Sequence, residues 1–183
     1  MKTKDIPQLI TDGNWECDFT LKDLVNRIEE MQVDNKRYKK TLEMNPDFQR
    51  GHVWTEEQQT SFIESLLQGG AKNARVIYLN CPDWNNESNL YYHDFVCVDG
   101  LQRYTAIKRF INYEIKAFGL YLNEYEDEEI FHGKSFYMRL NINHLQTRAE
   151  VLKWYLQVND GGTPHTKEEV NKVKKLLEEE KCK

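Results

Sequence analysis

Apolar residues recur along the chain at two spacings, three or four residues in some segments and two in others. Helical spacing follows four threonines and one glycine: Thr20, Thr55, Gly100, Thr147 and Thr166. Each threonine has an acidic or amide residue three positions later, which is the pattern of a helix capping box. The pattern therefore predicts five helices, the second of which ends at Gly69-Gly70.

Two-residue alternation and short apolar runs, which are typical of strands, occupy intervening segments. These segments are residues 38–44, 75–80, 95–98, 115–122 and 136–142. The run at 95–98 is apolar throughout, which indicates a buried strand. Helices interleaved among four to six strands predict a mixed α+β domain.

Length and composition fit one domain of ordinary size. The chain has 183 residues, 39% hydrophobic and 12% aromatic, which is too apolar for a disordered chain. No linker or internal repeat divides it, so we assign residues 1–19 to an N-terminal extension and residues 20–180 to one domain. No apolar run approaches the roughly 18 residues of a membrane span, and no basic-then-apolar leader opens the chain.

Charge and cysteine content narrow the class of protein further. Lys and Arg number 25 against 30 Asp and Glu, a formal net charge of −5. A general coat for duplex DNA needs a broad positive face, so the balance argues against that function while leaving a local basic patch open. The four cysteines are scattered without Cys-x-x-Cys pairs, so neither a zinc cluster nor a disulfide framework is indicated. We expect a reduced, soluble, cytoplasmic protein.

The segment of residues 95–107 contains the most informative candidate site, because a strand there turns directly into a helix. A helix start offers unpaired N–H groups and a positive dipole end, which favour an anion. Gly100 lets a ligand approach closely, Gln102 can supply a positioning hydrogen bond, and Arg103 can contact phosphate in a bidentate manner. Asp99 is suited to hold Mg²⁺ that bridges phosphates. The alternative is an ordinary turn in which Asp99 only satisfies backbone N–H groups.

The loop of residues 45–54 carries a second polar cluster. Gln49 and Arg50 lie together there, beside two aromatic residues and a glycine. We assign the aromatic residues Phe48 and Trp54 to the core, and Arg50 to a surface that contacts a ligand.

In their order along the chain, these motifs resemble the N-terminal domain of GmrSD-type modification-dependent restriction systems. That family is related to the ParB and sulfiredoxin nucleotide-binding fold. The resemblance extends from about Thr20 to Leu177 and rests on Pro46-x-Phe-Gln-Arg50, Trp54, Ser65 before Gly69, Val98-Asp-Gly-Leu-Gln-Arg103 and Asn159-x-Gly-Gly-Thr163. It implies a ParB/sulfiredoxin-like mixed sheet with interleaved helices, and a setting of DNA restriction or phage–host conflict.

The resemblance also implies an activity and its residues. In that family an Asp-Gly-Gln-Gln-Arg motif is tied to the binding and hydrolysis of a nucleoside triphosphate. Catalytic roles are thereby implied for Asp99, Gln102 and Arg103, with Mg²⁺ on Asp99 as the cofactor. The segment from Gly100 to Arg103 is implied to bind the nucleotide, with Gln49 and Arg50 as the second wall of the pocket.

Leu101 stands where the family has its first glutamine. If that glutamine positions water or phosphate, hydrolysis here is weak while binding survives. A non-hydrolysing, DNA-associated or protein-binding module is therefore an alternative function. The related sulfiredoxin motif would place its nucleophilic cysteine at Leu101, so that reaction is removed from consideration, since Cys97 lies on the preceding strand.

Two further alternatives concern nucleic acid. Asp99 followed by Glu114 and Lys116 imitates the acids and lysine of metal-dependent nucleases, but the predicted helix between them would carry Glu114 away. The second alternative is a local basic face formed by Arg75, Arg103, Lys108 and Arg109. A solvated helix face also explains Lys108 and Arg109. The family's nuclease domain normally follows on the same chain, so we expect either a stand-alone version of the sensor half or a nuclease on another chain. DNA or a separate nuclease chain is an expected partner.

Overall fold

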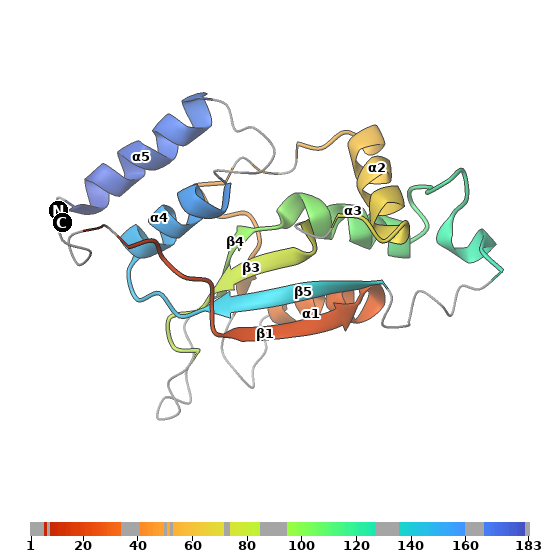
Figure 1. Ribbon diagram of the computed structural model, residues 1–183, viewed down its shortest axis with the longest axis horizontal. Coiled ribbons are helices and arrows are strands. Elements are labelled where there is room, and N and C mark those ends of the chain that lie inside the picture. Colours follow the sequence, from red (N-terminus) through yellow and green to blue (C-terminus); the bar gives the residue numbers. More distant parts are fainter. Residues whose placement is uncertain are drawn as a thin grey trace.

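A five-stranded mixed sheet organises the chain (Figure 1). The computed structural model describes residues 6, 8–33, 41–49, 51, 53–71, 74–84, 95–126, 136–159 and 167–181. The strands are β1 (Trp15–Thr20), β2 (Leu42–Glu43), β3 (Val76–Asn80), β4 (Phe95–Asp99) and β5 (Tyr137–Asn143). The helices are α1 (Leu21–Gln32), α2 (Glu56–Leu67), α3 (Leu101–Ile111), α4 (Arg148–Asn159) and α5 (Lys167–Lys181), with a short 3₁₀ helix η3 (Leu122–Glu124).

Parallel and antiparallel pairs alternate across the sheet, whose strand order is β1-β5-β3-β4-β2. The pairs β1–β5 and β3–β4 are antiparallel, and the pairs β3–β5 and β2–β4 are parallel. The α+β class with a mixed sheet and interleaved helices is therefore confirmed.

One side of the sheet, called here the aliphatic face, is covered by α1, α2 and α3. Strand side chains alternate between faces, so every second residue of each strand points to these helices. The core on this face includes Leu24, Ile28, Ile63, Leu66, Ile77, Leu79, Cys97, Ile107, Phe110, Met138, Leu140 and Ile142. These side chains are fully buried or nearly so, and their removal from water is the main stabilising contribution of this face.

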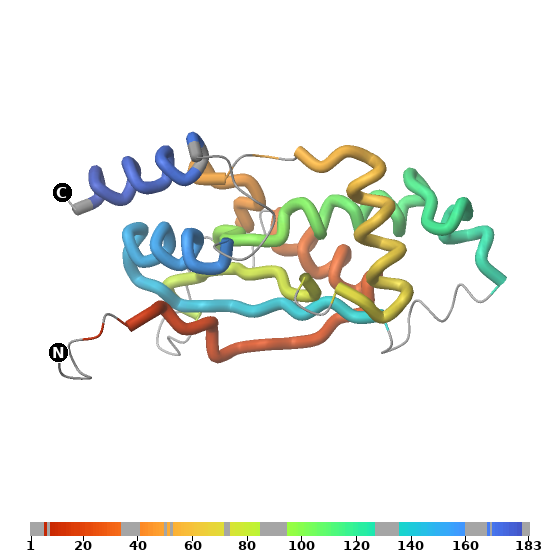
Figure 2. Tube along the Cα trace, turned by 45° about the horizontal axis from the view of Figure 1, so that its top comes forward, coloured from red at the N-terminus to blue at the C-terminus, as the bar shows by residue number. Residues whose placement is uncertain are grey.

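The opposite side, called here the polar face, is only partly covered. Helix α4 packs on β4, and α5 packs on α4, so these two helices lie together at one end of the molecule (Figure 2). A smaller apolar cluster fills this region and consists of Phe48, Val98, Val151, Leu152, Trp154, Tyr155 and Val173. Over β1 and β5 the same face carries charged and amide side chains, of which Arg139 is 38% exposed.

Three predicted helix starts are confirmed in detail. The Thr20 hydroxyl accepts a hydrogen bond from the Asp23 N–H, and Thr55 forms a complete capping box. Thr147 and Glu150 cap α4 in the same reciprocal way. The predicted cap at Thr166 lies outside the described residues.

Three predictions about the extent of the strands differ from the structure. Residues 115–122 do not form a strand, because Phe118 and Gly119 have φ values of 50° and 80° and reverse the chain between Ala117 and Leu120. Residues 15–19, assigned to an extension, are part of the edge strand β1. For the predicted strand 38–44, only Leu42–Glu43 is a strand, and residues 38–40 lie outside the described part of the chain.

Candidate functional site

The end of β4 carries a β-bulge that turns Asp99 toward the polar face. Leu79 pairs with Cys97, whereas the preceding residue of β3, Tyr78, pairs with Asp99. Val98 is therefore the extra residue, and such an insertion re-aims the side chains that follow it. Because directly paired residues share a face, Asp99 and Tyr78 lie side by side.

Gly100 is required by the backbone at the start of α3. Its φ is 119°, which L side chains rarely adopt, and a Cβ atom there would lie 2.9 Å from Cγ1 of Ile77 on β3. As the N-cap residue it has no side chain, so it makes no side-chain capping hydrogen bond. The start of α3 therefore keeps backbone N–H groups available for an acceptor.

Arg103 reaches back from the first turn of α3 to the end of β4. Its Nη2 donates a hydrogen bond of 2.5 Å to Oδ2 of Asp99, and the two side chains are 16% and 25% exposed. Its Nε is buried and has no hydrogen-bond partner among the residues that the structure describes. Buried donors are nearly always satisfied, so this guanidinium has one donor left to pair with an acceptor.

Gln102 holds the loop before α2 against the same junction. Its Oε1 accepts hydrogen bonds from the N–H groups of Val53 and Trp54, at 3.0 and 3.1 Å. Its Nε2 donates to the carbonyl oxygen of Gly51 at 2.6 Å. Both ends of this side-chain amide are thus bonded to the loop backbone.

Gln49 also links the loop of residues 45–54 to the junction, through β4. Its Nε2 donates a hydrogen bond of 2.6 Å to the carbonyl oxygen of Cys97 on β4. The structure therefore places Gln49 at the junction, and its role as a wall of a nucleotide pocket stays a prediction. Arg50, predicted as the other residue of that wall, lies outside the described residues.

Leu101 and Cys97 face away from the polar side. Leu101 is half-buried and packs against the core of the aliphatic face. Cys97 is fully buried, and burial, assisted by the negative charge of Asp99, raises the pKa of its thiol to about 12. A thiol with so high a pKa is a poor nucleophile, which agrees with excluding the sulfiredoxin reaction.

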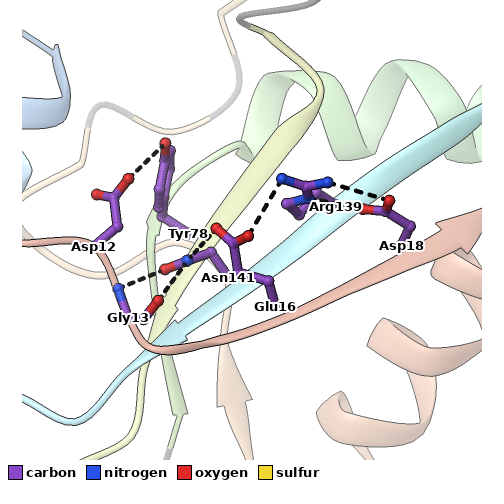
Figure 3. Close-up of polar contacts among 7 residues, drawn as sticks. All are labelled: Asp12, Gly13, Glu16, Asp18, Tyr78, Arg139 and Asn141. Carbon is purple, nitrogen blue, oxygen red and sulfur yellow. Dashed lines mark hydrogen bonds and ion pairs between the residues drawn. The ribbon is translucent and has the colours of Figure 1, made fainter.

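Sequence reasoning missed a second group of polar residues on the polar face, around Tyr78 and Asp12 (Figure 3). The Tyr78 hydroxyl donates to Oδ2 of Asp12 at 3.5 Å, and Nε1 of Trp154 donates to Oδ1 of the same carboxylate at 3.3 Å. Burial and the charge of Asp12 raise the pKa of Tyr78 to about 12, while the positive charge of Arg103 opposes this shift. The alternation along β3 could have placed Tyr78 on this face, but no local pattern marks Asp12.

The two nucleic-acid alternatives are not supported by the arrangement. Asp99 and Glu114 lie beyond opposite ends of α3, whose eleven residues span roughly 16 Å, so they do not converge. In the predicted basic face, Arg75 is buried and donates to backbone carbonyls, Lys108 pairs with Glu29, and Arg109 pairs with an acid on α2. These cations are already neutralised or buried.

The described side chains near Asp99 include few potential metal ligands. Within the described ranges, no group of three or more His, Cys, Asp or Glu side chains could hold a metal ion. Mg²⁺ commonly binds through one or two carboxylates together with substrate phosphates. Asp99 therefore fits an ion that arrives with a polyphosphate, and not a resident one.

Comparison with known proteins identifies one family. Residues 22–140, well over half of the chain, match the family described as the GmrSD restriction endonuclease, N-terminal domain. Among curated proteins and among solved structures, no match was found. None of the helices in the described part of the chain is long and apolar enough to cross a membrane.

Proposed function

This chain belongs to the family of N-terminal domains of GmrSD restriction endonucleases, and we propose that it binds a nucleoside triphosphate where β4 meets α3. The domain would act as the nucleotide-binding part of a DNA restriction or phage–host conflict system. DNA or a separate nuclease chain would be its partner in that system.

The state of Arg103 is the observation that carries the proposal. It is held at the start of α3 by Asp99, yet its buried Nε lacks a partner within the described structure. The neighbouring helix start has no side-chain cap. A phosphate group supplies acceptor oxygens for the guanidinium and for the N–H groups together, and the helix dipole favours its charge.

The other residues have roles that follow from their contacts. Asp99 would bind the Mg²⁺ that accompanies the triphosphate, which requires its hydrogen bond with Arg103 to rearrange. Gln49 and Gln102 would position the loop of residues 45–54 as the second wall. Arg50 on that loop would offset the charge of the phosphates.

Calorimetric titration of ATP, GTP, CTP and UTP with Mg²⁺ tests the proposal. We expect at least one nucleotide to bind, and Arg103→Ala to weaken it by about tenfold or more, since a charge-assisted hydrogen bond contributes about 1.5–3 kcal/mol. Arg27→Ala is the matched control, because Arg27 is an exposed helix residue that also pairs with an acid one turn away. Absence of binding for all four nucleotides would refute the proposal.

A second candidate is binding without turnover, and the contacts of Gln102 favour it. Both ends of its amide are bonded to the loop backbone, so it would have to leave the loop in order to orient an attacking water. A phosphate-release assay separates the two functions. Release that depends on Mg²⁺ and is abolished by Asp99→Asn would establish a hydrolase that cleaves the phosphoanhydride bond, whereas binding without release would establish a nucleotide sensor.

A further inference from the structure

Residues 10–13, called here the arm, are fastened across the polar face by side chains of β5 and α4. Gly13 lies so close to β5 that a Cβ atom would come within 1.9 Å of the Ile142 carbonyl oxygen. The fully buried Asn141 accepts a hydrogen bond from the Gly13 N–H and donates one to its carbonyl, each at 2.9 Å. Two more bonds hold the arm, from Asn143 to the Thr11 carbonyl and from the Ile10 N–H to Gln157.

This fastening fixes the position of Asp12, the exposed acid of the arm. One carboxylate oxygen accepts from the indole N–H of Trp154, a residue that is only 1% exposed, and the other accepts from the Tyr78 hydroxyl. The rings of these two donors pack edge to face, with centroids 5.5 Å apart. An ionised carboxylate has about four acceptor positions, so Asp12 can accept further hydrogen bonds from a ligand.

Tyr78 joins this carboxylate to the proposed phosphate site. Its backbone pairs with that of Asp99, the residue that holds Arg103, while its hydroxyl reaches Asp12. The charges of Asp12, Asp99 and Arg103 all influence the Tyr78 hydroxyl, so the three groups lie in its neighbourhood. A ligand with phosphates on Arg103 that extends along Tyr78 reaches Asp12.

We infer that Asp12 recognises the ribose of the bound nucleotide by accepting a hydrogen bond from its 2′-hydroxyl, which makes the ligand a ribonucleoside triphosphate. The inference rests on the proposed function. A carboxylate repels phosphate but accepts well from a neutral hydroxyl, so Asp12 suits the sugar and not the triphosphate. Tyr78 is a positioning residue that orients the Asp12 carboxylate.

The test compares each of ATP, GTP, CTP and UTP with its 2′-deoxy form, in the presence of Mg²⁺, by calorimetry on the intact chain. We expect the wild type to prefer the ribonucleotide by about tenfold or more, since a hydrogen bond to a charged group contributes about 1.5–3 kcal/mol. Asp12→Asn should reduce this preference to about threefold or less, chiefly by weakening the ribonucleotide. Tyr78→Phe should reduce it part of the way and leave the affinity for the 2′-deoxy form unchanged.

Asp18→Asn is the matched control, because Asp18 is an acid of the same face that bonds to Arg139 on β5. It should leave the preference for ribonucleotides as in the wild type. Equal affinity of the wild type for both sugar forms, or an unchanged preference in Asp12→Asn, would overturn the ribose inference alone. Failure of every nucleotide to bind would overturn the proposed function and this inference with it.

Discussion

The two faces of the sheet are formed by the same strands but are held together by different interactions. On β5, Met138, Leu140 and Ile142 point into the core of the aliphatic face and are at most 1% exposed. The alternate residues Arg139, Asn141 and Asn143 point to the polar face, where they bond to Asp18, Gly13 and Thr11. One face is held by non-directional burial and the other by directional hydrogen bonds.

The aliphatic face mainly provides stability, and the polar face carries the residues proposed to bind the ligand. The aliphatic face holds the helices to the sheet, and among the proposed site residues that the structure describes only Leu101 packs into it. Asp99 and Tyr78 belong to the polar face, and the arm fastened there brings Asp12 beside them. Changes to the aliphatic face should therefore reduce the free energy of unfolding, whereas changes to the polar face should mainly alter ligand binding.

Phe110→Ala should give the largest effect, on the aliphatic face. Phe110 is fully buried, so its truncation removes apolar contacts and leaves a cavity. We expect the free energy of unfolding to fall by about 3–5 kcal/mol, measured by urea denaturation. Phe118→Ala is the matched control, because Phe118 is 51% exposed, and its effect should stay within about 0.5 kcal/mol. Equal losses for the two variants would contradict this description of the core.

Gly13→Ala should give an intermediate effect, by detaching the arm from the polar face. The added methyl group cannot fit beside the Ile142 carbonyl, so both hydrogen bonds between Gly13 and Asn141 are lost, and the buried amide keeps only its bond to Glu16. We expect a loss of about 1–3 kcal/mol and a reduced preference for ribonucleotides. In a double-mutant cycle, the losses of Asn141→Ala and Gly13→Ala should be less than additive, since both remove the two bonds between these residues and Asn141→Ala removes in addition only its bond to Glu16. Additive losses would show that the two residues act independently.

Local patterns were sufficient to predict the helix starts and the junction. The threonine caps at Thr20, Thr55 and Thr147 are confirmed, because a cap depends on residues only three positions apart. The Asp99–Arg103 motif also spans a single turn, and the structure joins its two charged ends. That Asp99 binds Mg²⁺ and that Arg103 binds phosphate stay predictions.

Features that depend on distant contacts could not be predicted in the same way. Asp12 meets Trp154, 142 residues away, through a bond that no local pattern signals. The bulge at Val98, which turns Asp99 to the polar face, depends on the register of two strands. In contrast, the alternation of Trp15, Cys17 and Phe19 with acids did indicate β1, and assigning it to an extension overlooked this signal.

Arg139→Ala should have a small effect, because its ion pairs lie on the open part of the polar face. Arg139 donates to Asp18 and pairs with Glu16, but all three side chains are about 40% exposed. We expect a loss of about 0.5–1 kcal/mol at low salt that declines toward zero in 1 M salt. Arg75→Ala should cost more and depend less on salt, because that guanidinium is buried and bonds to the carbonyls of Leu66 and Gly70. If the loss of stability in Arg139→Ala did not change with salt concentration, the ion pairs of Arg139 would form a rigid network and not a solvent-exposed one.

Glu150→Gln should have the smallest effect, at the start of the helix that covers part of the polar face. Hydrogen bonds from the Thr147 side chain and N–H lower the pKa of Glu150 below its ordinary value of 4.5. A carboxyl group whose pKa is lowered by folding stabilises the fold above its unfolded pKa, and this contribution is lost as pH falls through the folded pKa. The variant should therefore lose a few tenths of a kcal/mol near neutral pH, since the pair is exposed and screened, and should match the wild type well below pH 4. Thermal melts across this range measure the difference. In a Thr147→Ala background the pH dependence of the same substitution should be reduced but not abolished, because the hydroxyl makes the largest contribution to the lowered pKa while the bond from the backbone N–H of residue 147 remains.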